Sequence, residues 1–193
     1  MSGVYTVPML SLTLSWDLFI VVFFAIVMSY SFLIGKDQSM KVIIAAYIAV
    51  IATQGIGNVL MRLIGDGEMV FRTVGIPVDI TLISLSKIFV FAVCIIIFVT
   101  RSGIELTHGK DTGTILTILY TALFGFSTAG LIVSTVLTYA GGNGILDSAI
   151  VSSSVLTPLI QSSTLMQLMI LNQDIWFTLP AFLIVAVGLV HSD

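Results

Sequence analysis

Four stretches of this sequence stay apolar for about twenty residues or more, and this feature limits the possible folds more strongly than any other. They cover about residues 12–34, 42–64, 80–99 and 114–140. A helix of about 20 apolar residues is long enough to cross the hydrocarbon core of a bilayer. A fifth stretch, 176–190, is shorter and contains Pro180 in its first turns, where proline is tolerated. The pattern predicts an all-α polytopic transmembrane helix bundle with four to five spans.

The composition supports a chain that is solvated by lipid. Of the 193 residues, 58% are hydrophobic and 9% are charged, whereas about one quarter of a soluble domain is charged. Runs such as LFIVVFFAIVM are apolar at every position, which favours helices over the alternating strands of a membrane barrel. The net charge of −3 is dispersed and forms no basic stripe, so we expect no nucleic-acid partner. Because the connections are short, we expect a single membrane domain over residues 1–193.

The basic residues predict which side of the membrane each connection faces. The loops 36–41 and 101–112 contain four of the seven Lys and Arg residues. The second connection and its border contain Arg62 and Arg72, and the N-terminus contains neither residue type. Cytoplasmic loops are enriched in Lys and Arg. We therefore expect a multi-pass protein with loops 36–41 and 101–112 in the cytoplasm and the N-terminus outside.

Lys87 lies inside the third apolar stretch, TLISLSKIFVFAVCIIIFVT. At 1.5 Å per residue it is about 12 Å below Asp79, taken as the outer boundary. An ionised side chain near the centre of a span costs about 2.5 to 3.5 kcal/mol, so Lys87 needs a polar neighbour. Asp17 or loosened backbone in the second helix could supply one. Two interpretations stay open: an anchor between helices, and a site for an anionic substrate or a proton-coupled group.

The second helix contains the motif TQGIGN, which places two glycines and two amides inside a span. Gly55 and Gly57 either admit a close neighbour or allow an unwound, ion-binding turn. Gln54 and Asn58 are four residues apart and share one face of a helix, which we expect to point into the bundle. The candidate intramembrane polar site comprises Asp17, Gln54, Asn58 and Lys87, with the patch Gly55–Asn58 at its centre.

Small residues recur at every fourth position of the fourth stretch. They are Gly113, Thr117, Thr121, Gly125 and Ala129. Small residues at this spacing let helix backbones approach closely. We therefore expect Gly125, Ala129 and Gly130 to pack against another helix, as Gly55 and Gly57 do in the second stretch. The sequence leaves open whether the partner helix belongs to the same chain or to a second protomer.

The segment 145–173 is less apolar and has an amphipathic pattern, with Pro158 as a break between two helices. One interpretation is a helix that lies on the outer leaflet or covers the bundle. The other is a re-entrant element whose Ser, Thr and Gln side chains line a polar cavity. The sequence does not decide between them, nor whether 176–190 spans the membrane.

Sequence motifs of catalysis and cofactor binding are absent. His108 and His191 are isolated, and no His/Cys/Asp/Glu cluster has the spacing of a metal site. No nucleophile elbow, phosphate-binding loop or dinucleotide fingerprint is present. We therefore expect a protein that is not an enzyme and that carries no cofactor and no metal.

The first helix with its flanks, SWDLFIVVFFAIVMSYSFLIGKDQS, resembles the colicin V production family of bacterial membrane proteins, the CvpA-like proteins. Two further spans, a fourth that opens after Asp111 and ends AGLIVS, and the segment SSSVLTPLIQ continue the resemblance over about residues 14–165. The chain departs from the family in its first loop, where Lys36, Asp37 and Gln38 stand in place of arginine and glutamate. Its fourth helix also has a less regular glycine ladder.

The resemblance implies an integral protein of the bacterial inner membrane without known catalysis, associated with toxin production or export and envelope homeostasis. The first functional expectation is therefore a protein that acts by assembly with itself, as a homo-oligomer, or with another envelope protein. The alternative is a small transporter or channel subunit with a polar intramembrane site at Lys87 and Gly55–Asn58. The lipid bilayer is the expected partner in both cases, and a small solute only in the second.

Overall fold

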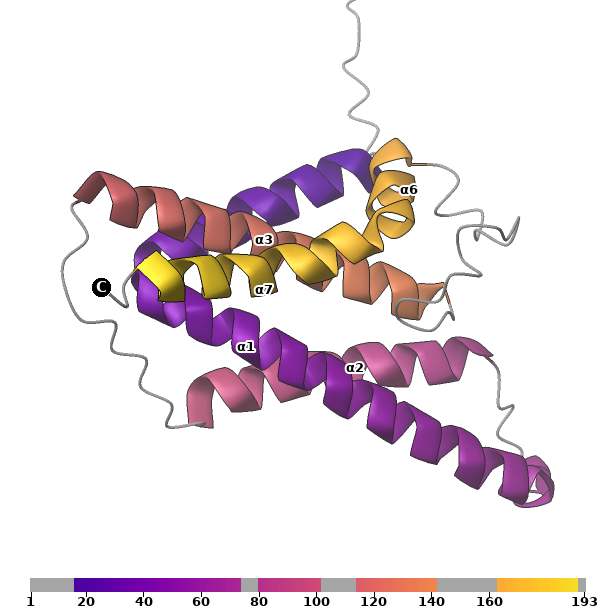
Figure 1. Cartoon of the computed structure of the whole chain (residues 1–193). Helices are drawn as coiled ribbons and strands as arrows, with labels where there is room; N and C mark the ends of the chain where they lie inside the picture. The colour runs from indigo at the N-terminus through magenta and orange to yellow at the C-terminus, as the bar shows by residue number, and fades with distance from the viewer. Residues whose placement is uncertain (1–15, 74–79, 102–113, 142–162, 191–193) are drawn as a thin grey trace, which may run out of the picture.

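The computed structural model of the protein describes residues 16–73, 80–101, 114–141 and 163–190. This part of the chain is built from helices and contains no strand (Figure 1), which confirms the all-α prediction. The helices are α1 (Trp16–Thr73), α2 (Ile80–Arg101), α3 (Thr114–Ala140), α6 (Thr164–Leu171) and α7 (Gln173–Val190).

Three helices in the described ranges are long and apolar enough to cross a membrane, namely α1, α2 and α3. The pair α6 and α7, bent by 65°, adds a fourth if it is counted as one span. The bounds of α2 and α3 agree closely with the predicted stretches 80–99 and 114–140. The predicted stretch 176–190 is helical and lies within α7. Most of the predicted amphipathic segment 145–173, namely residues 145–162, lies outside the described part.

Large apolar side chains cover the outer faces of these helices. Phe89 and Ile96 in α2 are 69% and 61% exposed, and Ile115 in α3 is 83% exposed. Contiguous apolar surface of this kind is unfavourable in water and is typical of helices that contact lipid. The protein is therefore a membrane protein.

α1 bends sharply at Gly35, which corrects the predicted loop at 36–41. Gly35 has φ 80° and ψ 177°, outside the helical region, and this positive φ suits a residue without a Cβ. The Ser39 hydroxyl donates to the Ser31 carbonyl at 3.3 Å, whereas eight residues of straight helix would separate them by about 12 Å. Residues 36–41 are helical because no proline or second glycine interrupts them. One glycine therefore makes the turn for which the sequence predicted a loop.

The elements run back and forth between two ends of the bundle (Figure 1). The bend of α1, the C-terminal end of α2 and the C-terminal end of α7 lie at one end. The start of α1, the start of α2, and α6 lie at the other. Lys36 follows the bend directly and Arg101 is the last residue of α2, so both belong to the same end. The predicted orientation has both basic residues in the cytoplasm, which requires them to lie at the same end of the bundle.

α3 is the central helix and packs against all four others. Phe124, Leu131 and Tyr139 on this helix are fully buried. Glycine and hydroxyl residues fill most of its remaining buried positions. Gly125 faces α1, because a Cβ there would lie 2.9 Å from the Cβ of Ser31. Gly130 faces α7, because a Cβ there would lie 2.0 Å from the Trp176 ring.

The small-residue face of α3 is therefore occupied by helices of the same chain. Thr121, Gly125, Ala129 and Gly130 are all buried within the bundle. Gly113 lies outside the described residues. The sequence left open whether the partner helix belongs to this chain or to a second protomer. For Gly125 and Gly130, the partner helices belong to this chain.

Pro180 lies in the interior of α7, and a side chain from α1 compensates for it. The Tyr47 hydroxyl donates to the Phe177 carbonyl and accepts from the Ala181 amide at 3.1 Å. Phe177 and Ala181 are four residues apart, so the hydroxyl takes the place of a backbone hydrogen bond of the helix. Proline is tolerated in a membrane helix where a neighbouring helix satisfies the freed backbone groups in this way. Tyr47 therefore fixes the interface between α1 and α7.

Candidate intramembrane polar site

Lys87 lies on α2 against a groove that Gly57 leaves open on α1. A Cβ built on Gly57 would be 2.8 Å from Cε of Lys87. Gly57 is buried and Lys87 is partly buried, so the aliphatic part of the lysine covers the glycine. Gly55 differs, because a Cβ there meets nothing within 4 Å. Of the two glycines in TQGIGN, Gly57 accommodates Lys87 and Gly55 faces outward.

A small cavity lies beside this contact, between α1 and α2. It has a volume of about 30 Å³, and its lining residues are Thr53, Ile56, Gly57, Ser86, Lys87 and Val90. The surface that lines it is almost entirely apolar, so the cavity has room for a small group but few polar atoms to hold one. It lies where Lys87 of α2 meets the glycine-containing motif of α1.

Thr53 is the polar residue on the α1 side of this cavity. It is 0% exposed, and its Oγ1 has no hydrogen-bond partner. Other helical threonines satisfy this group by donating to the carbonyl four residues earlier. They are Thr100, Thr121, Thr128, Thr135 and Thr138. Leaving a buried hydroxyl unpaired costs about 1–3 kcal/mol, so Thr53 is the least satisfied hydroxyl of this set.

Tyr139 of α3 lies near Lys87 but does not line the cavity. Its ring centroid is 6.0 Å from Nζ of Lys87, the outer limit of a cation–π interaction. Its hydroxyl donates to the Val50 carbonyl at 3.4 Å and also interacts with the Thr53 side chain. Tyr139 also packs edge-on against Phe91 of α2, with ring centroids 6.1 Å apart. The aromatic ring therefore offers partial electrostatic compensation to the lysine.

The structure does not bring Asp17 to this site. Oδ1 of Asp17 accepts hydrogen bonds from the Ser163 hydroxyl at 2.5 Å and from the Leu165 amide at 3.1 Å. Ser163 is the N-cap of α6, and its Oγ accepts from the Met166 amide. A carboxylate at a helix N-terminus is stabilised by the unpaired amides and by the helix dipole. Asp17 thus ties the start of α1 to α6 and is not the partner of Lys87.

The two predicted amides lie outside the cavity lining. Gln54 is partly buried and Asn58 is exposed, and neither lines the cavity. Sequence reasoning singled out these amides and missed Thr53 and Tyr139. Thr53 could have been noticed as the first residue of TQGIGN. Nothing in the sequence placed Tyr139, which is more than 50 residues from Lys87, beside it.

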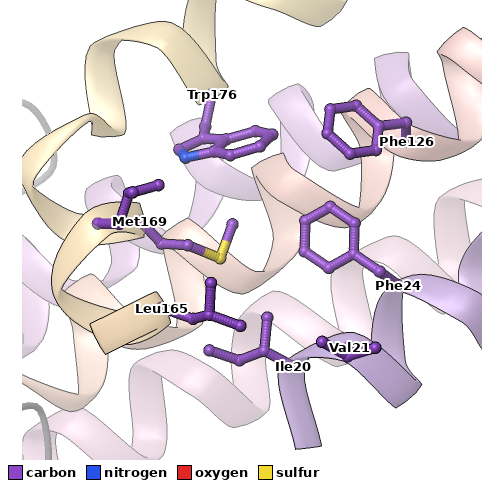
Figure 2. Close-up of a pocket in the computed structure, with 8 residues that line it drawn as sticks. Ile20, Val21, Phe24, Phe126, Leu165, Met169 and Trp176 are labelled. Carbon is purple, nitrogen blue, oxygen red and sulfur yellow. The ribbon is translucent and has the colours of Figure 1, made fainter. Parts of the chain in front are cut away.

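A second, larger cavity is also apolar (Figure 2). Its volume is about 310 Å³, and it lies between the first arm of α1, α3 and the α6–α7 pair. Figure 2 shows Phe24, Phe126 and Trp176 facing one another at its upper side; their ring centroids are 5.4 to 5.9 Å apart. Nε1 of Trp176 is buried without a hydrogen-bond partner. This cavity offers no charged group to a ligand.

The described residues contain no group of three or more His, Cys, Asp or Glu side chains that could hold a metal ion. His108 and His191 lie outside the described part of the chain. The sequence matches no known family model and no curated protein, and the structure matches no solved structure. The resemblance to the CvpA-like family therefore stays a prediction from the sequence.

Proposed function

We propose that the protein is a small transporter or channel subunit whose solute interacts with the polar site at Lys87. The observation that carries this proposal is that Lys87 and Thr53 line one cavity between two apolar helices. Ionisable residues inside a membrane are expensive and mark pathways for ions and substrates. The proposal is that the cavity is one position on such a pathway.

The alternative role for Lys87 is a structural anchor between helices. An anchor would pair the ammonium with a carboxylate or a carbonyl on the neighbouring helix. Asp17 is engaged with α6 instead. Within the described part of the chain, the contacts of Lys87 are its packing on Gly57 and the distant ring of Tyr139. These contacts favour a site over an anchor.

The proposed membrane topology treats the two arms of α1 as separate crossings. The arms are 16–34 and the helix that follows Gly35, and they run in opposite directions from the bend (Figure 1). With α2, α3 and the α6–α7 pair, this gives five crossings. We place the bend and the end of α2 in the cytoplasm and the N-terminus outside, because Lys36 and Arg101 share one end of the bundle. The bacterial inner membrane is the proposed location, from the family resemblance.

Assembly in toxin production or export, as in the CvpA-like family, is supported less well. Its sequence support included the small-residue face around Gly125. That face packs on Ser31 and Trp176 of the same chain. No described surface therefore favours assembly specifically.

Flux through reconstituted protein tests the proposal. Purified protein is placed in liposomes, and the movement of potassium, chloride and acetate is followed separately by light scattering. We expect flux of at least one of these ions, with at least a tenfold reduction in Lys87→Met. Lys41→Met, the same change at a lysine outside the cavity, is the matched control and keeps the flux.

Two results would contradict the proposal. One is the absence of flux for all three ions from correctly folded protein. The other is full flux in Lys87→Met. A Lys87→Met protein that unfolds at a higher temperature, together with no flux in the wild type, identifies Lys87 as a structural residue with an unfavourable charge.

A further inference from the structure

We infer that the apolar cavity between the first arm of α1, α3 and the α6–α7 pair binds one acyl chain of a membrane phospholipid. None of the residues that line it also lines the small cavity beside Lys87. The inference goes beyond the proposed function, because it concerns a lipid site and does not require that the protein moves a solute.

The bend between α6 and α7 creates this cavity. The two helices meet at 65°, so α6 leaves the direction of α7. Asn172 ends α6, because its backbone amide and its side-chain amide both donate to the Leu168 carbonyl. Oδ1 of Asp17 holds the other end of α6 against α1 by accepting from the Leu165 amide. Among the described residues, these helices and α3 therefore enclose a space of about 310 Å³.

The exposed fractions of the lining residues show that the cavity is open to one side. Ile20 of α1 and Met169 of α6 form its inner wall and are 4% and 2% exposed. Val21 of α1 and Leu168 of α6 lie at its rim and are 55% and 49% exposed. Both rim residues belong to the apolar outer surface, which is typical of helices that contact lipid. A lipid molecule therefore reaches the cavity from the bilayer without passing through the bundle.

The chemistry of the lining selects a hydrocarbon ligand. Every residue that lines the cavity is aliphatic or aromatic, and none is charged. Apolar cavities stay dry, and one of about 150 Å³ binds a benzene molecule. The volume of about 310 Å³ is at the lower end of the range of about 300–1,000 Å³ for ligand pockets. The cavity therefore has room for a stretch of hydrocarbon and offers no charge to an ion.

The arrangement of the walls favours a flexible chain over a flat ring. The rings of Phe24, Phe126 and Trp176 have centroids 5.4 to 5.9 Å apart, so they contact one another and leave no slot for a planar ligand between them. Leu165 and Met169 form the wall below them (Figure 2). Methionine is unbranched and adapts its shape to its neighbours. An acyl chain, which also adapts its shape, matches these walls.

The position of the cavity along α1 fits an acyl chain that enters from one leaflet. Trp16 is the first residue of α1, and tryptophan is enriched where a span meets the membrane interface. Asp17 precedes Ile20 and Val21 by three and four residues, so the three residues share one face of the helix. The cavity therefore begins about one helical turn from the polar start of α1. This is the depth at which the acyl chains of a leaflet begin.

Quenching of Trp176 fluorescence by a brominated phospholipid tests the inference. The chain contains two tryptophans, so Trp16→Phe leaves Trp176, which lines the cavity, as the only indole. This variant is purified in detergent and titrated with a phosphatidylcholine that carries bromine in the middle of its acyl chains. Bromine quenches indole fluorescence on contact. We expect quenching that saturates at one lipid per protein and that unbrominated phosphatidylcholine reverses.

Val21→Phe and Val22→Phe, each combined with Trp16→Phe, form the matched pair of variants. Both valines are exposed on α1, but only Val21 lines the cavity. A phenylalanine at position 21 fills the rim, so we expect half-saturation to need about tenfold more lipid. Val22→Phe keeps the original response. Leu168→Phe and Leu171→Phe repeat the comparison on α6 if Val21→Phe does not fold, because both leucines are exposed and only Leu168 lines the cavity.

Two results would overturn the inference. Quenching that grows in proportion to the lipid, without saturation, and that is equal in Val21→Phe and Val22→Phe shows that lipid only surrounds the protein as a solvent. The absence of quenching at every lipid concentration shows that another part of the chain or a second copy fills the cavity. Neither result changes the proposed function, because flux and its dependence on Lys87 are measured separately.

Discussion

Two interfaces of this protein each contain a glycine against a large side chain, and they differ in what that side chain can do. At the α3–α7 interface, Gly130 faces the rigid indole ring of Trp176, which also contacts Phe24 and Phe126. At the α1–α2 interface, Gly57 faces the flexible end of Lys87 beside an unpaired hydroxyl and a small cavity. Rigid packing fixes the position of helices. A flexible charged chain beside an open space is suited to binding.

The two interfaces are alike in one respect, because each holds a buried polar atom without a hydrogen-bond partner. At the α3–α7 interface this atom is Nε1 of Trp176, and at the α1–α2 interface it is Oγ1 of Thr53. The difference between the interfaces therefore lies in the flexibility of the side chain that faces the glycine, and not in the satisfaction of polar groups.

Gly130→Ala is expected to have the largest effect on stability. The added Cβ would lie 2.0 Å from the Trp176 ring, and overpacking of this kind costs about 1–3 kcal/mol or more. The free energy of unfolding in mixed micelles measures the loss. Gly188→Ala, where a Cβ meets nothing within 4 Å, is the control and should not be destabilised. If both variants unfold alike, the α3–α7 interface is not rigid and the comparison fails.

Tyr47→Phe is expected to have the next largest effect. It leaves the Phe177 carbonyl and the Ala181 amide without the bridging hydroxyl, and a backbone polar group that is unpaired in a hydrocarbon environment is costly. The unfolding free energy of the single variant is compared with that of Tyr47→Phe combined with Pro180→Ala. The alanine lets α7 restore its own hydrogen bonds, so the combined variant should recover part of the loss. No recovery would mean that the hydroxyl acts apart from the proline.

Gly57→Ala is expected to change stability least. The Lys87 chain can move away from the new methyl group, and alanine favours a helix over glycine by about 0.5–1 kcal/mol. The two effects nearly cancel, whereas Gly55→Ala, with open space around it, should be stabilised by about that amount. The free energies of unfolding of the two variants in mixed micelles measure this difference. A strongly destabilised Gly57→Ala would show that this interface is as rigid as the other.

The sequence predicted the helices well because hydrophobic length is a local property. The stretches 80–99 and 114–140 became α2 and α3 with almost the predicted bounds. It failed at 36–41, where a glycine, two lysines and an aspartate suggested a loop. Only Gly35 leaves the helical region there, since one residue with positive φ is sufficient for the bend. Local polarity does not reveal how few residues a turn needs.

The candidate site was predicted in part, for a related reason. Lys87 and Gly57 could be proposed because a charge and a glycine are unusual within a span, and both are at the cavity. Asp17, Gln54 and Asn58 were proposed on polarity and helical spacing. Asp17 is engaged at α6 instead, and neither amide lines the cavity. Thr53 became notable only when its hydroxyl was found buried and unpaired, a property that depends on every neighbouring helix.

The sequence by itself determined that this chain is a helical membrane protein and that Lys87 is an unfavourable residue in its span, because both follow from the transfer of side chains into lipid. The tertiary structure alone decided the partners. In the folded chain Asp17 binds α6, Tyr47 bonds to the proline-containing part of α7, and Tyr139 and Thr53 lie near Lys87. These choices depend on which helix faces touch, and contacts between residues far apart in the chain leave no periodic pattern in the sequence.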